Sequence, residues 1–221
     1  VVVKVVESVP FVPGGNVLKV LGLDADLTAA PALLLAVAVD GRVDGHTGEP
    51  GAHLGARAGV GHGAAKGSTD VIYVKVASGL GAGIVLGGRL HRGTTGIAGE
   101  LGHVQVVEDG QVCRCGNRGC LETLVSASRL MSVLQPAYDG ELSVERALAL
   151  EEDGDAGVRR VFSDAGLAIG RALADLCNSL NPEVLVVGGS LGASPSLRDA
   201  IRSAVDRYAQ PDTAAALRVV A

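Results

Sequence analysis

Short runs of β-branched and aliphatic residues, separated by glycine-rich turns, mark the middle of the chain. The run VIYVKV that begins at Val71 is bounded by polar and glycine residues and predicts a buried strand. The glycine-rich turn Ala77–Gly83 and a second strand over Ile84–Leu86 would complete a hairpin. The run EVLVV at Glu183–Val187 predicts a further strand.

Helical periodicity replaces these short runs after residue 122. Thr123–Leu134 predicts a helix, because a glutamine and a proline follow it directly. A second helix is expected from Ser143, a suitable N-cap, to about Gly154. Apolar residues recur every three or four positions through Asp155–Leu180, which predicts a long helix with one buried face. A last helix is expected over Ser196–Tyr208.

The first third of the chain is harder to interpret. Val1–Val6 and Leu33–Val39 are apolar enough to predict two strands. Between Asp40 and Gly67 the chain is rich in glycine and has little periodicity, so we expect a loop there. The alternation of strands and helices over the whole chain predicts an α/β protein.

Composition bounds the class of protein. The chain has 221 residues, of which 48% are hydrophobic and 2% aromatic, and this predicts a globular protein with a core of Val, Leu and Ala. A formal net charge of -5 argues against a broad nucleic-acid surface, so DNA contacts would need a part outside this chain. We find no signal peptide and no membrane span, and expect a cytoplasmic protein. The chain does not begin with Met and reads as a fragment.

One histidine and three cysteines have the spacing of a metal site. The possible ligands are His103, Cys113, Cys115 and Cys120, and glycines at 116 and 119 would let the chain turn back towards the ion. One imidazole and three thiolates make a complete tetrahedral set for a structural Zn²⁺. The alternatives are ordinary buried thiols or disulfides, although a C-x-C pair is poorly placed to bond to itself.

The same stretch resembles the signature of the ROK family, which comprises repressors, uncharacterised open reading frames and sugar kinases. Its pattern is G-x-x-G-E-x-G-H followed by C-x-C-G-x-x-G-C-x-E, and the resemblance is good from about Asp70 to Val220 and looser before. The matching residues are Gly96, Gly99, Glu100, Gly102, His103, Cys113, Cys115, Gly116, Gly119, Cys120 and Glu122.

This resemblance implies an actin-like, ribonuclease H-like fold of two lobes. Residues 1–66 would be a partial small N-terminal lobe, and residues 67–221 the large lobe with a zinc-binding segment over residues 99–122, called here the Cys/His loop. The family's opening D-x-G-x-T strand and its expected last helix are absent, so the fold would be truncated at both ends.

The resemblance also implies a sugar site. Glu100, His103 and Glu122 correspond to the residues that contact sugar hydroxyls in hexose-binding relatives. Carboxylates accept hydrogen bonds from hydroxyls, and a histidine bound to metal through one nitrogen presents the other in a fixed direction. The alternative for the two glutamates is a pair of solvated loop carboxylates.

Two groups of glycines resemble nucleotide-binding elements. Ser78, Gly79, Gly81 and Gly83 correspond to a turn that resembles a phosphate cradle in the family's kinases. The alternative is a hairpin whose glycines supply positive φ angles. Gly188-Gly189, between the strand at 183–187 and the last helix, fits the edge of a nucleotide-binding lobe or a plain βα unit.

The position of the family's catalytic base holds no acceptor. Kinases of the family carry a motif resembling E-N-D-A-N-x-x-A, in which the aspartate deprotonates the sugar hydroxyl. The corresponding segment here is Glu49–Ala56, and Gly51 stands in place of the aspartate. Loss of a positioned base commonly lowers a rate by about 10² to 10⁴. Phe11 likewise replaces the sugar-contacting glycine of the family's V-P-G.

We therefore interpret the chain as the sugar-sensing effector domain of a ROK-type transcriptional regulator. Its ligand would be a monosaccharide or a sugar phosphate, its helix-turn-helix would precede this chain, and it would form a homodimer or a dimer of dimers. The first alternative is a hexose kinase of the glucokinase type, which would need ATP and Mg²⁺. The second is a sugar-binding or structural module with neither activity.

Overall fold

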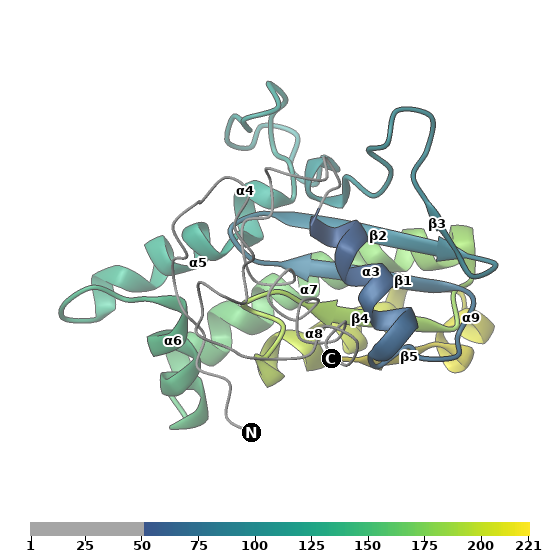
Figure 1. The fold of residues 1–221 in the computed structure, drawn as a ribbon. Coiled ribbons are helices and arrows are strands. Elements are labelled where there is room, and N and C mark those ends of the chain that lie inside the picture. The colour runs from purple at the N-terminus through teal and green to yellow at the C-terminus, as the bar shows by residue number, and fades with distance from the viewer. Residues whose placement is uncertain (1–50) are drawn as a thin grey trace, which may run out of the picture.

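A five-stranded mixed sheet forms the centre of the molecule, with the strand order β3-β2-β1-β4-β5 (Figure 1). The structure is a computed structural model, and it describes residues 51–221. The strands are β1 Val71–Val76, β2 Leu80–Leu86, β3 Arg89–His91, β4 Val184–Gly188 and β5 Arg218–Val220. β1, β2 and β3 pair antiparallel, whereas β4 runs parallel to both β1 and β5. The hairpin expected from the sequence is therefore confirmed.

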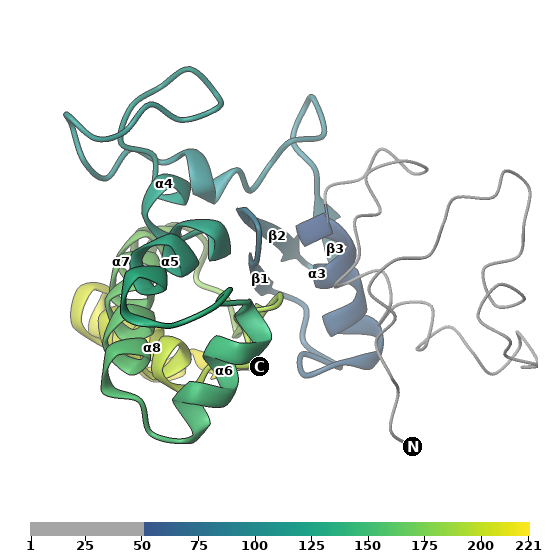
Figure 2. The same cartoon turned by 90° about the vertical axis from the view of Figure 1, so that its left-hand side faces the viewer.

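Helices cover both faces of this sheet. Helix α3 lies on one face, and α7 and α8 lie with α5 and α6 on the other (Figure 2). The helices are α3 Gly51–His62, η1 Leu101–His103, α4 Glu122–Val125, α5 Ala127–Leu134, η2 Gln135–Ala137, α6 Val144–Glu152, α7 Ala156–Leu180, α8 Pro195–Tyr208 and α9 Pro211–Ala216. Among the helices of residues 51–221, none is long and apolar enough to cross a membrane.

Alternation along the strands divides the core into two clusters. On β1, Ile72 and Val74 face α7, while Val71 and Tyr73 face α3. Successive side chains of a strand point to opposite faces, so both faces of a central strand must be apolar when both are covered. The continuous apolar runs in the sequence are thus explained by a sheet between two helical layers.

Helix capping explains where the long helices begin and end. Ser143 accepts a hydrogen bond from the Arg146 N–H at the start of α6, and Asp155 accepts one from the Val158 N–H at the start of α7. Asn181 ends α7 in the left-handed conformation with φ 46°. Both helices were predicted with these starting residues, and both predictions are confirmed.

The prediction of a loop between Asp40 and Gly67 is wrong for the second half of that segment, because Gly51–His62 forms helix α3. A Cβ atom on Gly55 would overlap the ring of Tyr73, and one on Gly83 would overlap the carbonyl of Ala52. The glycines on both sides thus let the helix approach the sheet closely. Tertiary packing outweighs the poor helix propensity of glycine here.

Other differences concern shorter elements. The single helix expected over Thr123–Leu134 is two helices, because Ser126 is extended, with φ -61° and ψ 147°. β2 begins at Leu80, four residues before the prediction, and β3, α9 and β5 were not predicted. The strands predicted at Val1–Val6 and Leu33–Val39 lie outside the described residues, as does the replacement at Phe11.

Candidate metal centre and ligand site

The Cys/His loop projects from the edge of the sheet beside α4 (Figure 1). Short backbone hydrogen bonds shape it, including Cys113 N–H to the Asn117 carbonyl at 2.7 Å and Gly116 N–H to the Cys113 carbonyl at 2.9 Å. Gly116 and Gly119 have φ of 92° and 65°, which other residues rarely adopt. The turning role expected of these two glycines is confirmed.

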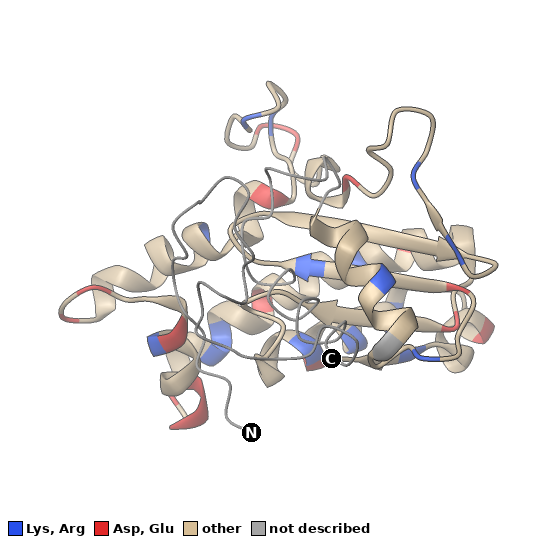
Figure 3. Ribbon diagram, in the orientation of Figure 1, with Lys and Arg blue, Asp and Glu red and all other residues tan. Residues whose placement is uncertain are grey.

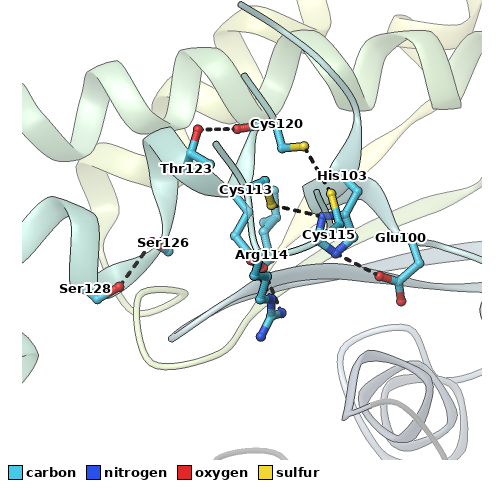
Figure 4. Close-up of polar contacts among 11 residues, drawn as sticks. Glu100, His103, Cys113, Arg114, Cys115, Cys120, Thr123, Ser126 and Ser128 are labelled. Atoms are coloured by element: carbon cyan, nitrogen blue, oxygen red, sulfur yellow. Dashed lines mark hydrogen bonds and ion pairs between the residues drawn. The ribbon is translucent and has the colours of Figure 1, made fainter. Parts of the chain in front are cut away.

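The loop brings the four predicted ligands together. One donor atom each from His103, Cys113, Cys115 and Cys120 lies within 4.8 Å of all the others, and Figure 4 shows them converging. Sulfurs about 2.3 Å from a common centre in a tetrahedron are about 3.8 Å apart, and a sulfur and a nitrogen about 3.5 Å. The observed separations are 3.7 Å between Cys115 Sγ and Cys120 Sγ, and 3.5 Å between Cys113 Sγ and His103 Nδ1. The cluster can therefore hold a metal ion.

The disulfide alternative does not fit this geometry. All three cysteines of the loop are free, and a disulfide would need sulfurs about 2.05 Å apart. Burial raises the pKa of Cys120 to about 12, whereas the backbone N–H of Asn117 lowers the pKa of Cys115. Cys177 lies apart, buried on α7, as expected.

His103 connects the metal cluster with a carboxylate. Its Nδ1 faces Cys113, and its Nε2 lies 3.4 Å from Oε2 of Glu100, whose side chain is about half exposed (Figure 4). A metal bound at Nδ1 would fix the proton on Nε2 and direct it away from the cluster. The ring thus has the two-sided orientation that the sequence suggested.

Glu122 has partners that the sequence did not reveal. The residue is 9% exposed, and its carboxylate pairs with Arg114 at 3.0 Å between Oε1 and Nε and accepts a hydrogen bond from the Leu80 N–H at 3.2 Å. Gly102 lies against Glu122, since a Cβ on Gly102 would be 3.3 Å from the Glu122 Cβ. The Glu122 carboxylate is therefore fixed by neighbouring groups, and the alternative that it is a solvated loop carboxylate is wrong.

The glycines after Ser78 do not serve to supply positive φ angles. None of Gly79, Gly81 and Gly83 has a positive φ, so the hairpin alternative based on positive φ angles is wrong. Gly81 and Gly83 lie within β2 and face α3, and Gly79 lies against Glu122. Close packing explains Gly79 and Gly83, whereas a Cβ on Gly81 would make only an ordinary contact, at 3.6 Å from the Ala52 Cβ. The phosphate cradle stays a prediction.

Gly188 and Gly189 end β4 under similar constraints. A Cβ on Gly188 would overlap the Tyr73 hydroxyl, and one on Gly189, which has φ 86°, would overlap the carbonyl oxygen of Val76. These contacts explain the double glycine without a nucleotide, so its nucleotide-binding role stays a prediction.

A lysine side chain lies beside Gly51, the position where the resemblance expects a catalytic aspartate. Gly51 begins α3, and a Cβ atom there would lie 2.8 Å from Nζ of Lys75 on β1. No carboxylate of residues 51–221 forms an ion pair with this lysine. This approach could not be predicted from the sequence, because the two residues belong to different elements.

A buried histidine ties α3 to the segment before Glu100. His53 is 1% exposed and donates from Nε2 to the carbonyl oxygen of Ala98 at 2.7 Å. Its Nδ1 has no hydrogen-bond partner in the described part of the chain. Sequence reasoning did not single out His53, and a buried position for it could only be expected once α3 was known.

Comparisons with a family model and with known proteins all indicate the same family. Residues 51–221 match the family model described as ROK family, a start well before the Asp70 expected from the motifs. The xylose repressor of Bacillus spizizenii is 32% identical over 150 residues, covering 67% of this chain and 39% of the repressor. The glucokinase of Halalkalibacterium halodurans is 33% identical over 168 residues, covering 69% of this chain and 51% of the glucokinase.

A solved structure extends the likeness to the fold. The crystal structure of a ROK family transcriptional regulator, a homologue of the E. coli MLC protein, aligns with a TM-score of 0.69 and 32% identity. The alignment covers 74% of this chain and 44% of that structure. The actin-like fold expected from the motifs is thereby confirmed. The chain spans only part, between 39% and 51%, of the curated relatives described above.

Proposed function

Because the chain belongs to the ROK family, we propose that it is the sugar-sensing effector part of a transcriptional regulator. Relatives of both kinds are equally similar, at 32% identity for the repressor and 33% for the glucokinase, so similarity alone does not separate the two functions. A helix-turn-helix outside this chain would contact DNA, and the protein would act in the cytoplasm as a homodimer or a dimer of dimers.

The pairing of Gly51 with Lys75 carries the choice of a regulator over a kinase. A sugar hydroxyl that attacks ATP needs a proton acceptor, and Gly51 supplies none. The neighbouring ammonium group of Lys75 has no free lone pair while it is charged, so it cannot take that proton. A site with this arrangement can bind a sugar without activating its hydroxyl group.

Zinc is the metal that the donor set supports best. Three cysteine sulfurs and one histidine nitrogen, separated by tetrahedral distances, fill every position of a structural zinc site and leave none for substrate. When bound, the ion would hold the Cys/His loop closed. His103 would then present Nε2 beside Glu100 in one orientation.

The proposed sugar ligand would bind to Glu100, His103 and Glu122. Glu100 has an exposed carboxylate that can accept from hydroxyl groups, and His103 can donate from Nε2. Glu122 is nearly buried and already held by Arg114 and Leu80, so its carboxylate is fixed before any ligand arrives. Preorganised groups of this kind bind without the entropy cost of being ordered.

A glucokinase-type activity remains the second candidate function. The similarity to a glucokinase favours it, and Ser78 with the glycines after it would then approach the phosphates of ATP with Mg²⁺. This candidate requires a base other than Gly51.

Calorimetry with xylose, glucose, mannose and N-acetylglucosamine tests the sensing function, and a coupled assay with ATP and the same sugars tests the kinase. We expect one sugar to bind, with no ATP-dependent turnover above background. Glu100→Gln should weaken that binding, while Glu108→Gln, at an exposed glutamate of the same loop, should not. Turnover that is lost in Glu100→Gln would instead establish the kinase.

The regulatory step needs the full-length protein. We expect it to bind DNA from its own promoter region in a gel-shift assay. Its affinity for that DNA should change when the sugar that binds in calorimetry is added. A ligand shifts such an equilibrium only by its differential affinity for the two states. Retention that no sugar alters would count against a sensor.

A further inference from the structure

A polar pocket of about 490 Å³ lies between the Cys/His loop and the start of α5. Its walls carry Arg114 from the loop, Glu122 from α4, and Ser126, Ser128 and Arg129 around the start of α5. Figure 4 shows Arg114, Ser126 and Ser128 on this side of the metal cluster. The pocket shares Glu122 with the proposed sugar site but includes neither Glu100 nor His103.

The charge of this pocket is opposite to that of the chain. Two arginines face a single carboxylate, in a protein whose formal net charge is -5. Figure 3 shows basic residues on both the Cys/His loop and α5. Arg114 pairs with Glu122 through Nε and Oε1 at 3.0 Å and through a terminal nitrogen and Oε2 at 3.2 Å. The positive charge of Arg129 is therefore not balanced by Glu122. Within residues 51–221, Arg129 forms no ion pair.

The two serine hydroxyls of the pocket contact each other and do not cap the helix. Ser126 is the N-cap of α5, yet its side chain makes no capping bond to the described backbone and instead lies 3.3 Å from the Ser128 hydroxyl. Ser126 is only 7% exposed and so is a built part of the wall, whereas Ser128 is exposed at its rim. The first N–H groups of a helix have no partner inside the helix, and its start favours negative charge.

We propose that this pocket binds a phosphate group. Arg129 would supply the charge, the Ser126 and Ser128 hydroxyls and the start of α5 would supply further donors, and Arg114 would bridge the anion to Glu122. Arginine suits this role because its planar group binds two oxygens at once while its other N–H groups hold a carboxylate. Ser78 of the Ser78–Gly83 turn also lines the pocket, but neither arginine comes from that turn, and the shared Glu122 joins the pocket to the proposed sugar site.

Two sources of phosphate fit this chemistry. The group can belong to the effector itself, which would then be a sugar phosphate, or it can be free inorganic phosphate that binds beside a neutral sugar. The first source rests on the proposed sensing function, whereas the second does not.

Calorimetry of the full chain separates these sources with inorganic phosphate, glucose and glucose 6-phosphate, and with N-acetylglucosamine and its 6-phosphate. We expect a sugar phosphate to bind at least about tenfold more tightly than its neutral sugar, since hydrogen bonds to charged groups have this strength. Arg129→Gln and Arg114→Gln should abolish the difference. Arg118→Gln, at an exposed arginine of the same loop outside the pocket, should retain it.

Each outcome decides the proposal. Inorganic phosphate that binds as tightly as the sugar phosphates, and loses affinity in Arg129→Gln, supports the pocket with free phosphate as its occupant. Absence of binding by every anion, or binding unchanged in Arg129→Gln, overturns the proposal. If a neutral sugar binds and no anion does, the phosphate pocket is refuted and the sensing function stands. If an anion binds, loses affinity in Arg129→Gln, and no sugar binds, the pocket stands and the sensing function is refuted. Since Arg114→Gln leaves Glu122 buried without its partner, Arg129→Gln is decisive if Arg114→Gln does not fold.

Discussion

Nε2 of His103 lies 3.4 Å from Oε2 of Glu100, while Nδ1 of the same ring lies 3.5 Å from the Cys113 sulfur. One side chain therefore belongs to both the metal cluster and the proposed ligand site. A change on one side of the ring must be felt on the other, because the imidazole is rigid.

Removal of the metal should weaken sugar binding, although no sugar oxygen would touch the ion. Cys113→Ser and Cys120→Ser are expected to lose zinc and to bind sugar about 10- to 100-fold more weakly, the range typical of disrupted outer-shell contacts. Calorimetry with metal analysis of each variant checks this. Cys177→Ala, at the cysteine outside the cluster, should keep both zinc and affinity. If folded, zinc-free variants bind sugar normally, His103 does not link the two sites.

Zinc binding should release protons and strengthen as the pH rises. Burial raises the pKa of Cys120 to about 12, so this thiol keeps its proton near pH 7 until a metal displaces it. A raised pKa means that protons compete with the ion more strongly at lower pH. Calorimetry in buffers of different ionisation enthalpy should show more than one proton released per ion, and a heat independent of the buffer would contradict this.

Close packing between α7 and α8 should make Gly166 intolerant of any side chain. A Cβ atom there would overlap the Leu197 carbonyl oxygen and lie 2.7 Å from the Ala200 Cβ, so Gly166→Ala should destabilise the fold by about 1 to 3 kcal/mol. Gly61→Ala is the matched control, because a Cβ there meets nothing within 4 Å. That change should be neutral or stabilise the helix by up to about 1 kcal/mol. Urea unfolding measures both, and equal effects would show that the contact does not matter.

Acid should remove the contribution that the ionised Asp155 carboxylate makes to the stability of the fold. The Tyr138 hydroxyl at 2.7 Å and the Val158 N–H hold the pKa of this carboxyl below its usual value. A lowered pKa in the folded state means that the stabilisation is present above about pH 4, the usual pKa of the unfolded chain, and is lost as the pH falls through the folded value. Asp155→Asn should therefore lower the Tm at pH 7 and do so much less at pH 3. An equal loss at both pH values would exclude an ionic contribution.

The sequence was most informative where local chemistry decides the structure. Caps at Ser143 and Asp155 and the spacing of the cysteines are local features, and the helices and the metal cluster follow from them. The sequence could not reveal α3, because Gly55 is needed for its contact with Tyr73 and Ala52 packs on Gly83, and both partners lie on strands that follow later in the chain.

The site was predictable to a similar extent. The motif suggested Glu100, His103 and Glu122 as sugar ligands, which stays a prediction, and the pairing of Glu122 with Arg114 depends on how the loop folds back on α4. The approach of Lys75 to Gly51 likewise depends on the placement of a helix against a strand. Contacts between separate elements carry no periodicity, so patterns along the chain cannot show them.

The hydrogen bond from His53 to the Ala98 carbonyl oxygen gives the molecule a mechanical coupling. Ala98 lies two residues before Glu100, and His53 lies on α3, the first described helix. If a ligand pulls Glu100, the segment at Ala98 must either carry α3 with it or break a buried bond. Breaking the bond would leave both ring nitrogens of His53 without partners in the described part of the chain. Because α3 packs closely on Tyr73 of β1 and Gly83 of β2, displacement of the helix would cost that packing as well, so the bond would anchor the segment before Glu100 to the sheet.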